Sequence, residues 1–344
     1  MKAIVQHAFG APDVLRYEEV ADPVCGPNDV LVRVHAVSVN RTLDLAVRAG
    51  TYVRRPALPH VLGVDPSGEV IAVGDKVTDR KVGDRVFASL FVPTDDPAAP
   101  QIRETGRAYL LGVDIWGGYA EVVRLPRFVT HLIPDGLSYH DATVIARHAP
   151  TAFNLVERRG EVKPGQWVLV MGASGGLGSA IVQIAKLNGA RVIAAAGADS
   201  RVAAALEFGA DHGVNYRTQD LGAEIARITD GYGTDLVCEN VGDPPLWKAA
   251  FWSMATGARM VTAGAHASQE VPLDPRRLYL KRLQIIGDGS EAPGGVARAL
   301  QFASEGKLKG RIDRVLPLSA AAEAHRLVAD REGVGKIILD PTLG

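Results

Sequence analysis

The stretch that decides the fold of this chain is Lys163-Pro-Gly-Gln-Trp-Val-Leu-Val-Met-Gly-Ala-Ser-Gly-Gly-Leu-Gly178. Within it, Trp167–Met171 is a short apolar run after a Pro-Gly turn, which predicts a buried parallel strand. Glycines follow at intervals of three residues. The next segment, Ser179–Leu187, has helical periodicity and stops before Gly189. The stretch therefore predicts a strand, a glycine turn and a helix in that order.

Such a turn points backbone N–H groups and a helix N-terminus at one place, where a pyrophosphate can bind. Glycine is needed because a Cβ atom would block the turn, the approach of the ligand or the packing of helix on strand. The spacing is Gly-x-x-Gly-x-x-Gly, with Ala173 in place of the usual first glycine. A plain tight turn is the alternative, but the flanking strand and helix favour a dinucleotide site. The residues expected to contact the dinucleotide here are Gly172, Ser174, Gly175, Gly176, Leu177 and Gly178.

From about residue 150 the pattern alternates between strands and helices, which predicts a doubly wound parallel sheet. The further strands are expected at 191–196, 213–216, 235–239, 258–262 and 283–286. The helices between them are expected at 201–208, 221–229 and 246–255.

The residues before this region show short β patterns, such as the alternation in Leu31–Val37, and predict a compact β domain. A short helix is expected from Asn40 to Ala49, ended by Gly50. Residues 92–114 include a proline-rich, polar surface lobe, for which disorder and ordering against a partner subunit both remain open. The end of the chain is expected to return to the first domain, with helices near 294–305 and 319–330 and a strand at 336–339. The expected domains are 1–148, 149–288 and 289–344.

Length and composition agree with a two-domain globular enzyme, because 344 residues exceed one typical domain. The net charge of −1 gives no general attraction to nucleic acid or to an anionic membrane. No secretory signal and no membrane-spanning run is visible, so we expect a cytoplasmic protein. Cys25 and Cys238 are the only cysteines, which excludes a four-cysteine zinc site and argues against a disulfide framework.

These features together resemble the medium-chain dehydrogenase/reductase superfamily over nearly the whole chain. Besides the glycine turn, the resemblance rests on Asn40-x-x-x-Asp44, Gly50-Thr-Tyr52, Leu62-Gly-Val-Asp-Pro-Ser-Gly-Glu-Val70, Val82-Gly-Asp-Arg-Val86, Gly117-Gly-Tyr-Ala-Glu121, Thr151-Ala152, Phe208-Gly-Ala-Asp-His212 and Gly335-Lys-Ile-Ile338. It implies an α/β protein in which a GroES-like β-barrel catalytic domain is joined to a Rossmann domain that binds a nicotinamide cofactor. It also implies cofactor contacts at Thr151, Gly242, Gly264 and Ala265.

The superfamily divides over zinc, and the resemblance here is to its zinc-free quinone oxidoreductase branch. Zinc-dependent members carry a cysteine near the position of Asn40, a Gly-His-Glu where this chain has Gly63-Val64-Asp65, and a cysteine or an acid near Arg147. Valine cannot coordinate a metal, arginine stays protonated and asparagine is a poor zinc ligand. We therefore expect no metal.

The cofactor is expected to be NADPH. NAD-binding folds place an acidic residue about 20 residues beyond the glycine turn, to bind the ribose 2′-OH. Gly197-Ala198 occupies that place and would not repel a 2′-phosphate, while Arg201 and Tyr216 follow nearby. In the resembled family a cation and a tyrosine at such positions hold the phosphate. Asp199 is a contrary feature unless it caps the next helix. The alternative is that Arg201 is an ordinary surface cation.

Three residues are candidates for the chemistry, each with a structural alternative. Tyr52 follows Gly50-Thr51, where similar enoyl reductases carry a tyrosine that faces the nicotinamide, and it either donates a proton or forms an aromatic wall. Asn40 either hydrogen-bonds the substrate oxygen or caps the helix that starts there. Arg147 either acts as electrophile or anion site in place of zinc, or pairs with Asp65.

Three functions compete. The first is an NADPH-dependent, zinc-free reductase of quinones or α,β-unsaturated carbonyls, acting on a small-molecule substrate as a homodimer or homotetramer. The second is a zinc-free oxidoreductase of alcohols and carbonyls or of enoyl thioesters. The third is a nucleotide-binding protein with a structural or RNA-binding role, as in crystallin relatives of the resembled family. The near-neutral charge gives that last function no support.

Overall fold

The computed structural model describes residues 1–102, 106–264, 267, 270–330 and 333–344. The chain forms two compact units. The first comprises Met1–Arg147 and Gly310–Gly344, and the second comprises His148–Lys309. The expected α/β class, with a β-rich first domain and a doubly wound parallel sheet, is confirmed. No helix in the described part of the chain is both long and apolar enough to cross a membrane.

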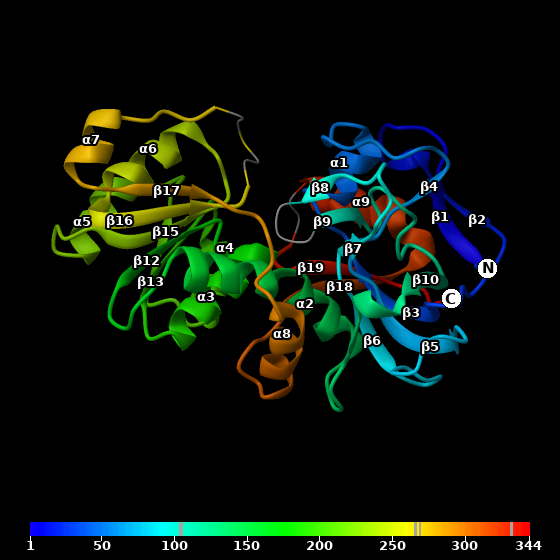
Figure 1. Cartoon of the computed structure of the whole chain (residues 1–344). Helices are drawn as coiled ribbons and strands as arrows, with labels where there is room; N and C mark the ends of the chain where they lie inside the picture. The colour runs from blue at the N-terminus through cyan, green and yellow to red at the C-terminus, as the bar shows by residue number, and fades with distance from the viewer. Residues whose placement is uncertain (103–105, 265–266, 268–269, 331–332) are drawn as a thin grey trace. The chain divides into compact units, whose positions relative to one another are not determined.

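The second unit contains a six-stranded parallel sheet in the order β14-β13-β12-β15-β16-β17 (Figure 1). Its strands are β12 (Trp167–Met171), β13 (Arg191–Ala196), β14 (His212–Asn215), β15 (Thr234–Glu239), β16 (Met254–Thr262) and β17 (Gln284–Gly287). The chain runs outward from β12 to β14 and then returns to β15 on the other side of β12. Because ligands of such sheets bind where the strand order reverses, the carboxyl ends of β12 and β15 mark the site.

Helices cover both faces of this sheet: α3 (Gly176–Leu187) and α4 (Asp199–Glu207) lie on one face, and α5 (Leu221–Ile228) and α6 (Pro244–Trp252) on the other (Figure 1). This explains why the strands read as unbroken apolar runs. Leu169 and Met171 of β12 pack in the cluster that includes residues of α5 and α6, and Val168 and Val170 between them are also fully buried.

The helix α7 (Pro275–Leu280) was missed by the sequence analysis, although its signal is visible. The carboxylate of Asp274 accepts hydrogen bonds from the backbone N–H groups of Arg276 and Arg277, and Pro275 occupies the first helical turn. An acidic N-cap followed by proline is a standard helix start. The same Asp-Pro pair begins α6 at Asp243.

The predicted return to the first domain at residue 289 is wrong, because residues 289–309 belong to the second unit. The helix α8 (Gly295–Ser304) packs there through its side chains. Arg298 forms two hydrogen bonds to the carboxylate of Glu157, and the Phe302 ring meets the Phe153 ring edge-on, with centroids 5.8 Å apart. The amphipathic pattern showed that this helix exists but not which core it covers.

The first unit is built around β3 (Asp29–Ser38), the longest strand of the chain. The main sheet has the order β11-β6-β5-β3-β19-β18, and β10 also pairs with β3. Smaller sheets have the orders β2-β1-β4 and β7-β9-β8. The remaining elements are β1 (Lys2–Gln6), β2 (Leu15–Glu19), α1 (Asp44–Ala49), β4 (His60–Val61), β5 (Ser67–Val73), β6 (Arg85–Ala88), β7 (Phe91–Pro93), β8 (Gln101–Ile102), β9 (Gly106–Leu110), β10 (Val122–Pro126), β11 (Thr130–Leu132), β18 (Ile312–Pro317), α9 (Ala321–Asp330) and β19 (Lys336–Asp340).

Two helical segments join these elements to the second unit's sequence. Helix α2 (Tyr139–Phe153) contains Arg147, the last residue of the first unit before the chain enters the second, and a π-helical turn, Asn154–Arg159, follows it. Short 3₁₀ turns lie at Pro12–Val14, Arg127–Val129 and Leu318–Ala320. The pairing of β19 with β3 sets Ile338 opposite Ser38. This pairing brings β19 beside the end of β3, two residues before the candidate residue Asn40.

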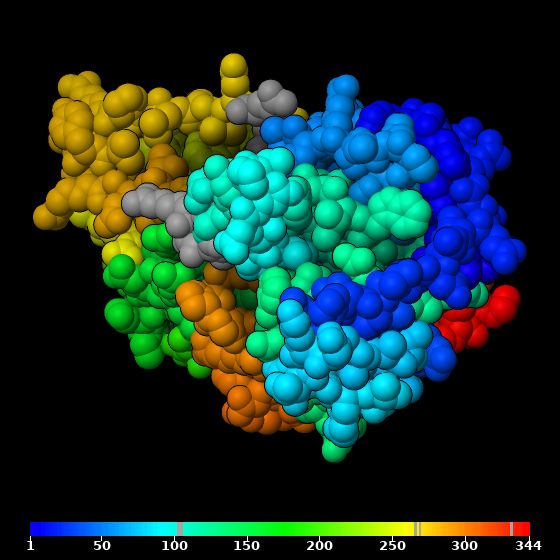
Figure 2. Space-filling model, turned by 45° about the vertical axis from the view of Figure 1, so that its right-hand side comes forward, coloured from blue at the N-terminus to red at the C-terminus, as the bar shows by residue number. Residues whose placement is uncertain are grey.

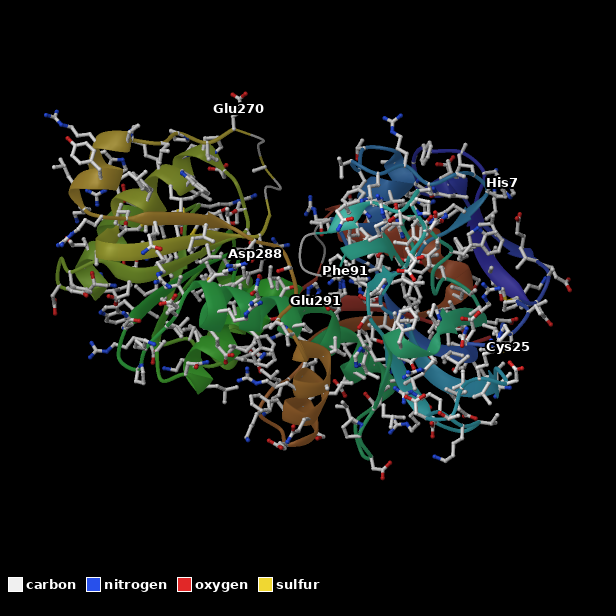
Figure 3. All side chains as sticks on the ribbon, in the orientation of Figure 1. His7, Cys25, Phe91, Glu270, Asp288 and Glu291 are labelled. Carbon is white, nitrogen blue, oxygen red and sulfur yellow. The ribbon has the colours of Figure 1, made fainter. Side chains whose placement is uncertain are left out.

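The described part of the proline-rich lobe forms the antiparallel sheet of β7, β9 and β8, which lies on the surface in cyan in Figure 2. Phe91, labelled in Figure 3, begins its first strand. The lobe has apolar residues on its inner side, since Val92 and Leu110 are buried. Polar contacts complete it: the Tyr109 hydroxyl donates a hydrogen bond to the Asp96 carboxylate at 2.5 Å. The described residues of the lobe are therefore ordered.

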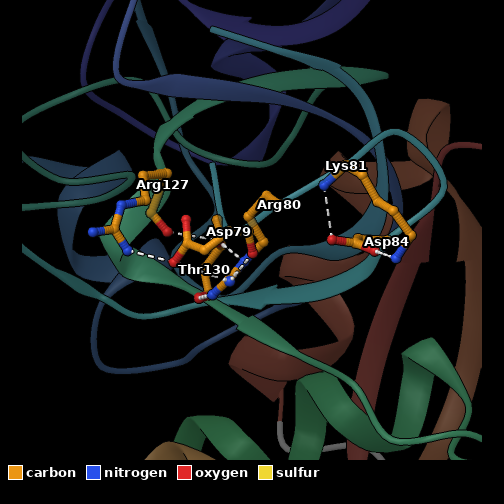
Figure 4. A network of polar contacts seen from close by, with 6 residues as sticks. All are labelled: Asp79, Arg80, Lys81, Asp84, Arg127 and Thr130. Atoms are coloured by element: carbon orange, nitrogen blue, oxygen red, sulfur yellow. Dashed lines mark hydrogen bonds and ion pairs between the residues drawn. The ribbon is translucent and has the colours of Figure 1, made fainter. Parts of the chain in front are cut away.

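Polar contacts also hold the connection between β5 and β6 (Figure 4). The guanidinium of Arg80 donates to the hydroxyl and the carbonyl oxygen of Thr130, at 3.1 and 2.6 Å. The Thr130 hydroxyl donates to the carbonyl oxygen of Arg127, whose own guanidinium donates to Asp79 at 2.6 Å. These contacts join the connection between β5 and β6 to the start of β11, so we assign them a structural role.

The two cysteines are free, as the sequence analysis expected. Cys25 is half-buried in the first unit (Figure 3), and Cys238 is buried within β15 of the second. Burial raises the pKa of the Cys238 thiol to about 12, so it stays protonated and unreactive at neutral pH.

His325 of α9 is fully buried and is held neutral by its neighbours. Arg48 lies with Nη1 at 3.2 Å from Nδ1 of the imidazole. Because arginine can only donate, Nδ1 must accept, and the ring proton is on Nε2, which faces the Tyr119 hydroxyl at 3.2 Å. Burial, and after it the charge of Arg48, lowers the pKa of His325 to about 3.

We expect acid to destabilise the first unit through His325. The unfolded state takes up the proton first, so the contribution is complete above the unfolded pKa and is lost as the pH falls toward the folded one. The free energy of unfolding should fall by up to about 1.4 kcal/mol per pH unit below about pH 6.5. Urea unfolding of the wild type and of His325→Gln measures this slope. The substitution should flatten it, and parallel curves for the two proteins would contradict the assignment.

Candidate active site

The glycine turn after β12 is closed so tightly that side chains are excluded. Gly172 has φ 68°, and a Cβ there would lie 2.7 Å from Oδ1 of Asn240, in the loop that follows β15. A Cβ at Gly178 would lie 2.2 Å from the carbonyl oxygen of Gly172, and one at Gly176 would meet the His148 ring. These glycines allow α3 to lie directly on β12, as the spacing predicted.

Gly175 differs from the others because its missing side chain leaves open space. A Cβ there would meet only the carbonyl oxygen of Gly172, at 3.5 Å. Gly175 is exposed, caps the twelve-residue helix α3 and is preceded by the half-buried Ser174, and the first turn, which includes Leu177, contains no acidic residue. An open helix N-terminus with bare backbone N–H groups and no carboxylate fits a pyrophosphate, so the turn fits a dinucleotide.

The predicted ribose end of the site is also assembled within the second unit. A Cβ at Gly197, after β13, would lie 3.0 Å from the Tyr216 hydroxyl, so the Tyr216 side chain lies against this residue. Arg201 lies in the first turn of α4 and is half-buried. Asp199 is not the cap of that helix, which is Ala198. Its carboxylate instead accepts a hydrogen bond of 2.7 Å from the Asn215 amide.

The loop after β15 is held by a buried carboxylate that sequence reasoning missed. Oε1 of Glu239 accepts hydrogen bonds from the backbone N–H groups of Val241 and Gly242, at 2.9 and 3.0 Å. Burial raises the pKa of Glu239. The signal was its position at the end of a predicted strand next to the glycine turn. Of the other expected cofactor contacts, Thr151 is buried in α2, Gly264 follows β16, and Ala265 lies outside the described residues.

In the first unit, the Asn40 side chain is 3% exposed and lies inside a polar network. Its amide nitrogen donates to Asp65 Oδ2 at 2.9 Å and also contacts Ser38, and its amide oxygen accepts from Lys336 Nζ at 2.8 Å. Asn40 does not cap α1, because that helix begins only at Asp44. The network therefore fixes both ends of the amide.

Asp44 and Lys336 complete the network and are fully or almost fully buried. The two carboxylate oxygens of Asp44 accept from the backbone N–H groups of Asn40 and Gly63, at 2.7 and 3.2 Å. Burial, together with the charge of Asp65, raises the pKa of Asp44 to about 7, and burial lowers the pKa of Lys336 to about 8. Neither residue had been proposed as part of the site.

Tyr52 is half-buried beside the core of the first unit. No hydrogen bond within the described residues engages its hydroxyl, so the group is available to a ligand. Burial raises the pKa of Tyr52, which keeps the phenol protonated at neutral pH, and the charge of Arg147 is among those that oppose this shift.

Arg147 does not pair with Asp65, which was one of the two alternatives for it, because the oxygens of Asp65 are occupied by Ser38 and Asn40. Its Nε is buried and has no hydrogen-bond partner. Its positive charge repels the ammonium of Lys336 and would attract the ionised form of Tyr52, so it lowers the pKa of both groups. The three residues therefore lie within electrostatic reach of one another. Within the described ranges, no cluster of three or more His, Cys, Asp or Glu side chains is arranged to hold a metal.

Comparison with known proteins agrees with both units. Residues 26–135 match the family model of the alcohol dehydrogenase GroES-like domain, and residues 176–305 match that of the zinc-binding dehydrogenase. The chain is 31% identical to the Homo sapiens quinone oxidoreductase, over 98% of this chain and 97% of the relative.

Solved structures are similar over almost the whole chain as well. One described as an NAD-dependent alcohol dehydrogenase is 37% identical with a TM-score of 0.90, and covers 99% of both chains. The quinone oxidoreductase of Pseudomonas syringae is 28% identical with a TM-score of 0.82, again over 99% of both chains.

Proposed function

The chain belongs to the medium-chain dehydrogenase/reductase superfamily, in its quinone oxidoreductase-like branch, and we propose that it reduces quinones or α,β-unsaturated carbonyls with NADPH and without zinc. It is an oxidoreductase of a family that binds a nicotinamide cofactor. The observation that carries the proposal is the hydroxyl of Tyr52, which is half-buried and which no hydrogen bond among the described residues engages. In the proposed reaction this phenol is the proton donor, and Arg147 supplies the positive charge that zinc supplies in zinc-dependent relatives.

The proposed reaction adds one hydride and one proton across the conjugated carbon–carbon double bond. Bound NADPH would supply the hydride to the β-carbon. Charge then develops on the carbonyl oxygen, and the α-carbon must take up a proton. Tyr52 donates that proton and recovers one from solvent, whereas Arg147 stays protonated and stabilises the charge. Asn40 touches Lys336 and Asp65, so we assign it to holding this segment in place.

Zinc independence rests on the residue types at the positions where zinc-dependent relatives carry ligands. Asn40, Val64 and Arg147 occupy those positions, and the Val64 side chain is fully buried. None of these side chains is a competent zinc ligand.

Product analysis in the presence of a metal chelator tests the function. The purified protein should oxidise NADPH with simple enones and quinones, keep that activity in the chelator and contain no stoichiometric zinc. An enone should yield the saturated ketone. Formation of the allylic alcohol would favour an alcohol dehydrogenase, as would one zinc per chain that is lost together with activity. Cofactor binding without turnover of any substrate would favour a structural role.

We expect NADPH to bind at least about tenfold more tightly than NADH, because charge-assisted contacts to the 2′-phosphate contribute about 1.5–3 kcal/mol. The support is the absence of a carboxylate at Gly197-Ala198, with Tyr216 and Arg201 nearby. Arg201→Ala should weaken NADPH binding about tenfold or more and leave NADH binding nearly unchanged.

Fluorescence titration of both cofactors measures this preference. Arg276→Ala removes an exposed cation of α7 in the same unit and serves as the control, which should change neither affinity. Equal losses of binding affinity for NADPH and NADH in Arg201→Ala would show that Arg201 does not contact the 2′-phosphate. A wild-type preference for NADH, the cofactor type named for the similar alcohol dehydrogenase, would overturn the NADPH assignment.

A further inference from the structure

The guanidinium of Arg147 is a cation without a local counter-charge. Its Nε is buried and has no hydrogen-bond partner, and no ion pair reaches it in the part of the chain that the structure describes. Arg54 of the same unit shows the usual arrangement, since it pairs with Asp114 at 2.7 Å. Arg147 itself is half-buried, but a buried guanidinium nitrogen that makes no hydrogen bond is unfavourable, and a ligand that accepts from it would remove that cost.

The carboxylates that might have neutralised Arg147 are occupied. Oδ1 of Asp65 accepts from the backbone N–H of Ser38 at 2.8 Å, and Oδ2 accepts from the Ser38 hydroxyl and the Asn40 amide. The network also has its own cation, Lys336, which donates to the Asn40 amide oxygen. Asp65 is thus committed to the internal network.

The second buried acid is committed in the same way. Both oxygens of Asp44 accept backbone N–H groups, from Asn40 and Gly63. The charges of Arg147 and Lys336 also repel each other, and that of Arg147 adds to the lowering of the Lys336 pKa that burial begins. An additional anion at Arg147 would therefore be attracted by Arg147, whereas the charge of Lys336 is offset by those of Asp65 and Asp44.

The proposed proton donor, Tyr52, is half-buried in the same unit as Arg147. The charge of Arg147 acts on the Tyr52 hydroxyl, and both side chains belong to the first unit. A substrate that places the α-carbon of its enone at Tyr52, as the proposed reaction requires, would therefore be within reach of the charge of Arg147. Guanidinium groups bind carboxylates through two parallel hydrogen bonds, which fixes orientation as well as charge.

We propose that Arg147 binds a carboxylate of the substrate, so that the preferred substrates are anionic enones in which the carboxylate is close to the conjugated double bond. The inference rests on the proposed function for the identity of the reacting group. Binding of a carboxylate at Arg147 does not require that the ligand be reduced, so it can be tested separately.

A matched pair of substrates tests the proposal. 4-Oxo-2-pentenoate and its methyl ester share the same enone and differ in one negative charge. The wild type should show a higher kcat/KM for the acid. In Arg147→Gln the acid-to-ester ratio of kcat/KM should fall about tenfold or more, the effect of losing a charge-assisted pair. Arg33→Gln removes an exposed cation of β3 in the same unit and should leave the ratio within about twofold. An unchanged ratio in Arg147→Gln, or a wild type that prefers the ester, overturns the proposal.

Calorimetric titration with the saturated acid 4-oxopentanoate separates this inference from the proposed function, since binding needs no reduction. Binding about tenfold weaker in Arg147→Gln than in the wild type supports the carboxylate site even if neither enone is reduced. Equal affinity overturns the site even if both enones are reduced. If Arg147→Gln does not fold, Arg147→Lys replaces it. Lysine keeps the charge but loses the two-pronged geometry, so affinity should fall several-fold, and an unchanged affinity also overturns the site.

Discussion

Replacing Tyr52 by phenylalanine is expected to lower kcat for an enone by about 10²–10⁴-fold, the usual contribution of a general acid. The substitution removes only the hydroxyl, which no hydrogen bond among the described residues engages, and keeps the ring that packs beside the core of the first unit. Folding and NADPH binding should therefore be retained. Steady-state kinetics with one enone and thermal unfolding of the same sample measure both parts.

The choice of substrate and of control makes this prediction sharp. A quinone should lose much less activity than an enone, because its reduced form can take a proton from water. Tyr109→Phe removes a hydroxyl that binds Asp96 in the surface lobe, and it should leave the enone kcat within about twofold. Normal turnover of the enone by Tyr52→Phe would make Tyr52 a wall of the pocket, and an equal loss with quinones would point to a binding role instead.

The parallel sheet could be predicted because its signals are local. The strand Trp167–Met171 was predicted with its observed bounds, and Arg191–Ala196 likewise. Both are buried on two faces, which produces an unbroken apolar run, and each connecting helix is short and amphipathic. The glycine turn was predicted for the same reason, since Gly178 has room for no side chain against Gly172.

The assignment of α8 to a domain failed because packing partners are not a local property. Its sequence shows an amphipathic helix, but only the structure shows that Arg298 meets Glu157 and that Phe302 meets Phe153. Helix α7 is a different case, because the pair Asp274-Pro275, an acidic N-cap followed by proline, indicates a helix start in the sequence. That signal was overlooked.

In the candidate site, too, the sequence indicated individual residues, whereas their packing partners became visible only in the structure. Tyr52, Asn40 and Arg147 were singled out through their positions in family motifs, and the structure adds the partners of each. Lys336 could not be connected to Asn40 from sequence, since almost 300 residues separate them and only the pairing of β19 with β3 joins them. Of the two alternatives for Arg147, the pair with Asp65 is not found, and Ser38 and Asn40 bind that carboxylate instead.

Lys336→Met is expected to destabilise the first unit by about 3 kcal/mol, near the lower end of the range for leaving a buried charge uncompensated. Lys336 Nζ donates to the carbonyl oxygen of Val39 and to the amide oxygen of Asn40, and methionine leaves both acceptors without a donor. It also leaves Asp44 and Asp65 buried without their cation. Two effects limit the loss of stability in Lys336→Met. Methionine avoids the desolvation that lowers the lysine pKa to about 8, and Asp44, whose pKa burial already raises to about 7, can take up a proton.

The proton uptake gives the Lys336→Met prediction a pH signature. Removing the cation raises the pKa of Asp44 further above its unfolded value, so the folded variant binds a proton that the unfolded chain has lost. The free energy of unfolding should therefore fall as the pH rises, and the loss relative to wild type should be greater at about pH 8 than at about pH 6. Chemical denaturation at both pH values measures it. Lys76→Met removes an exposed lysine of the same unit and should stay within about 0.5 kcal/mol of wild type. A variant as stable as wild type at both pH values would show that the ammonium group gives no net support, and a loss independent of pH would show that Asp44 does not take up the proton.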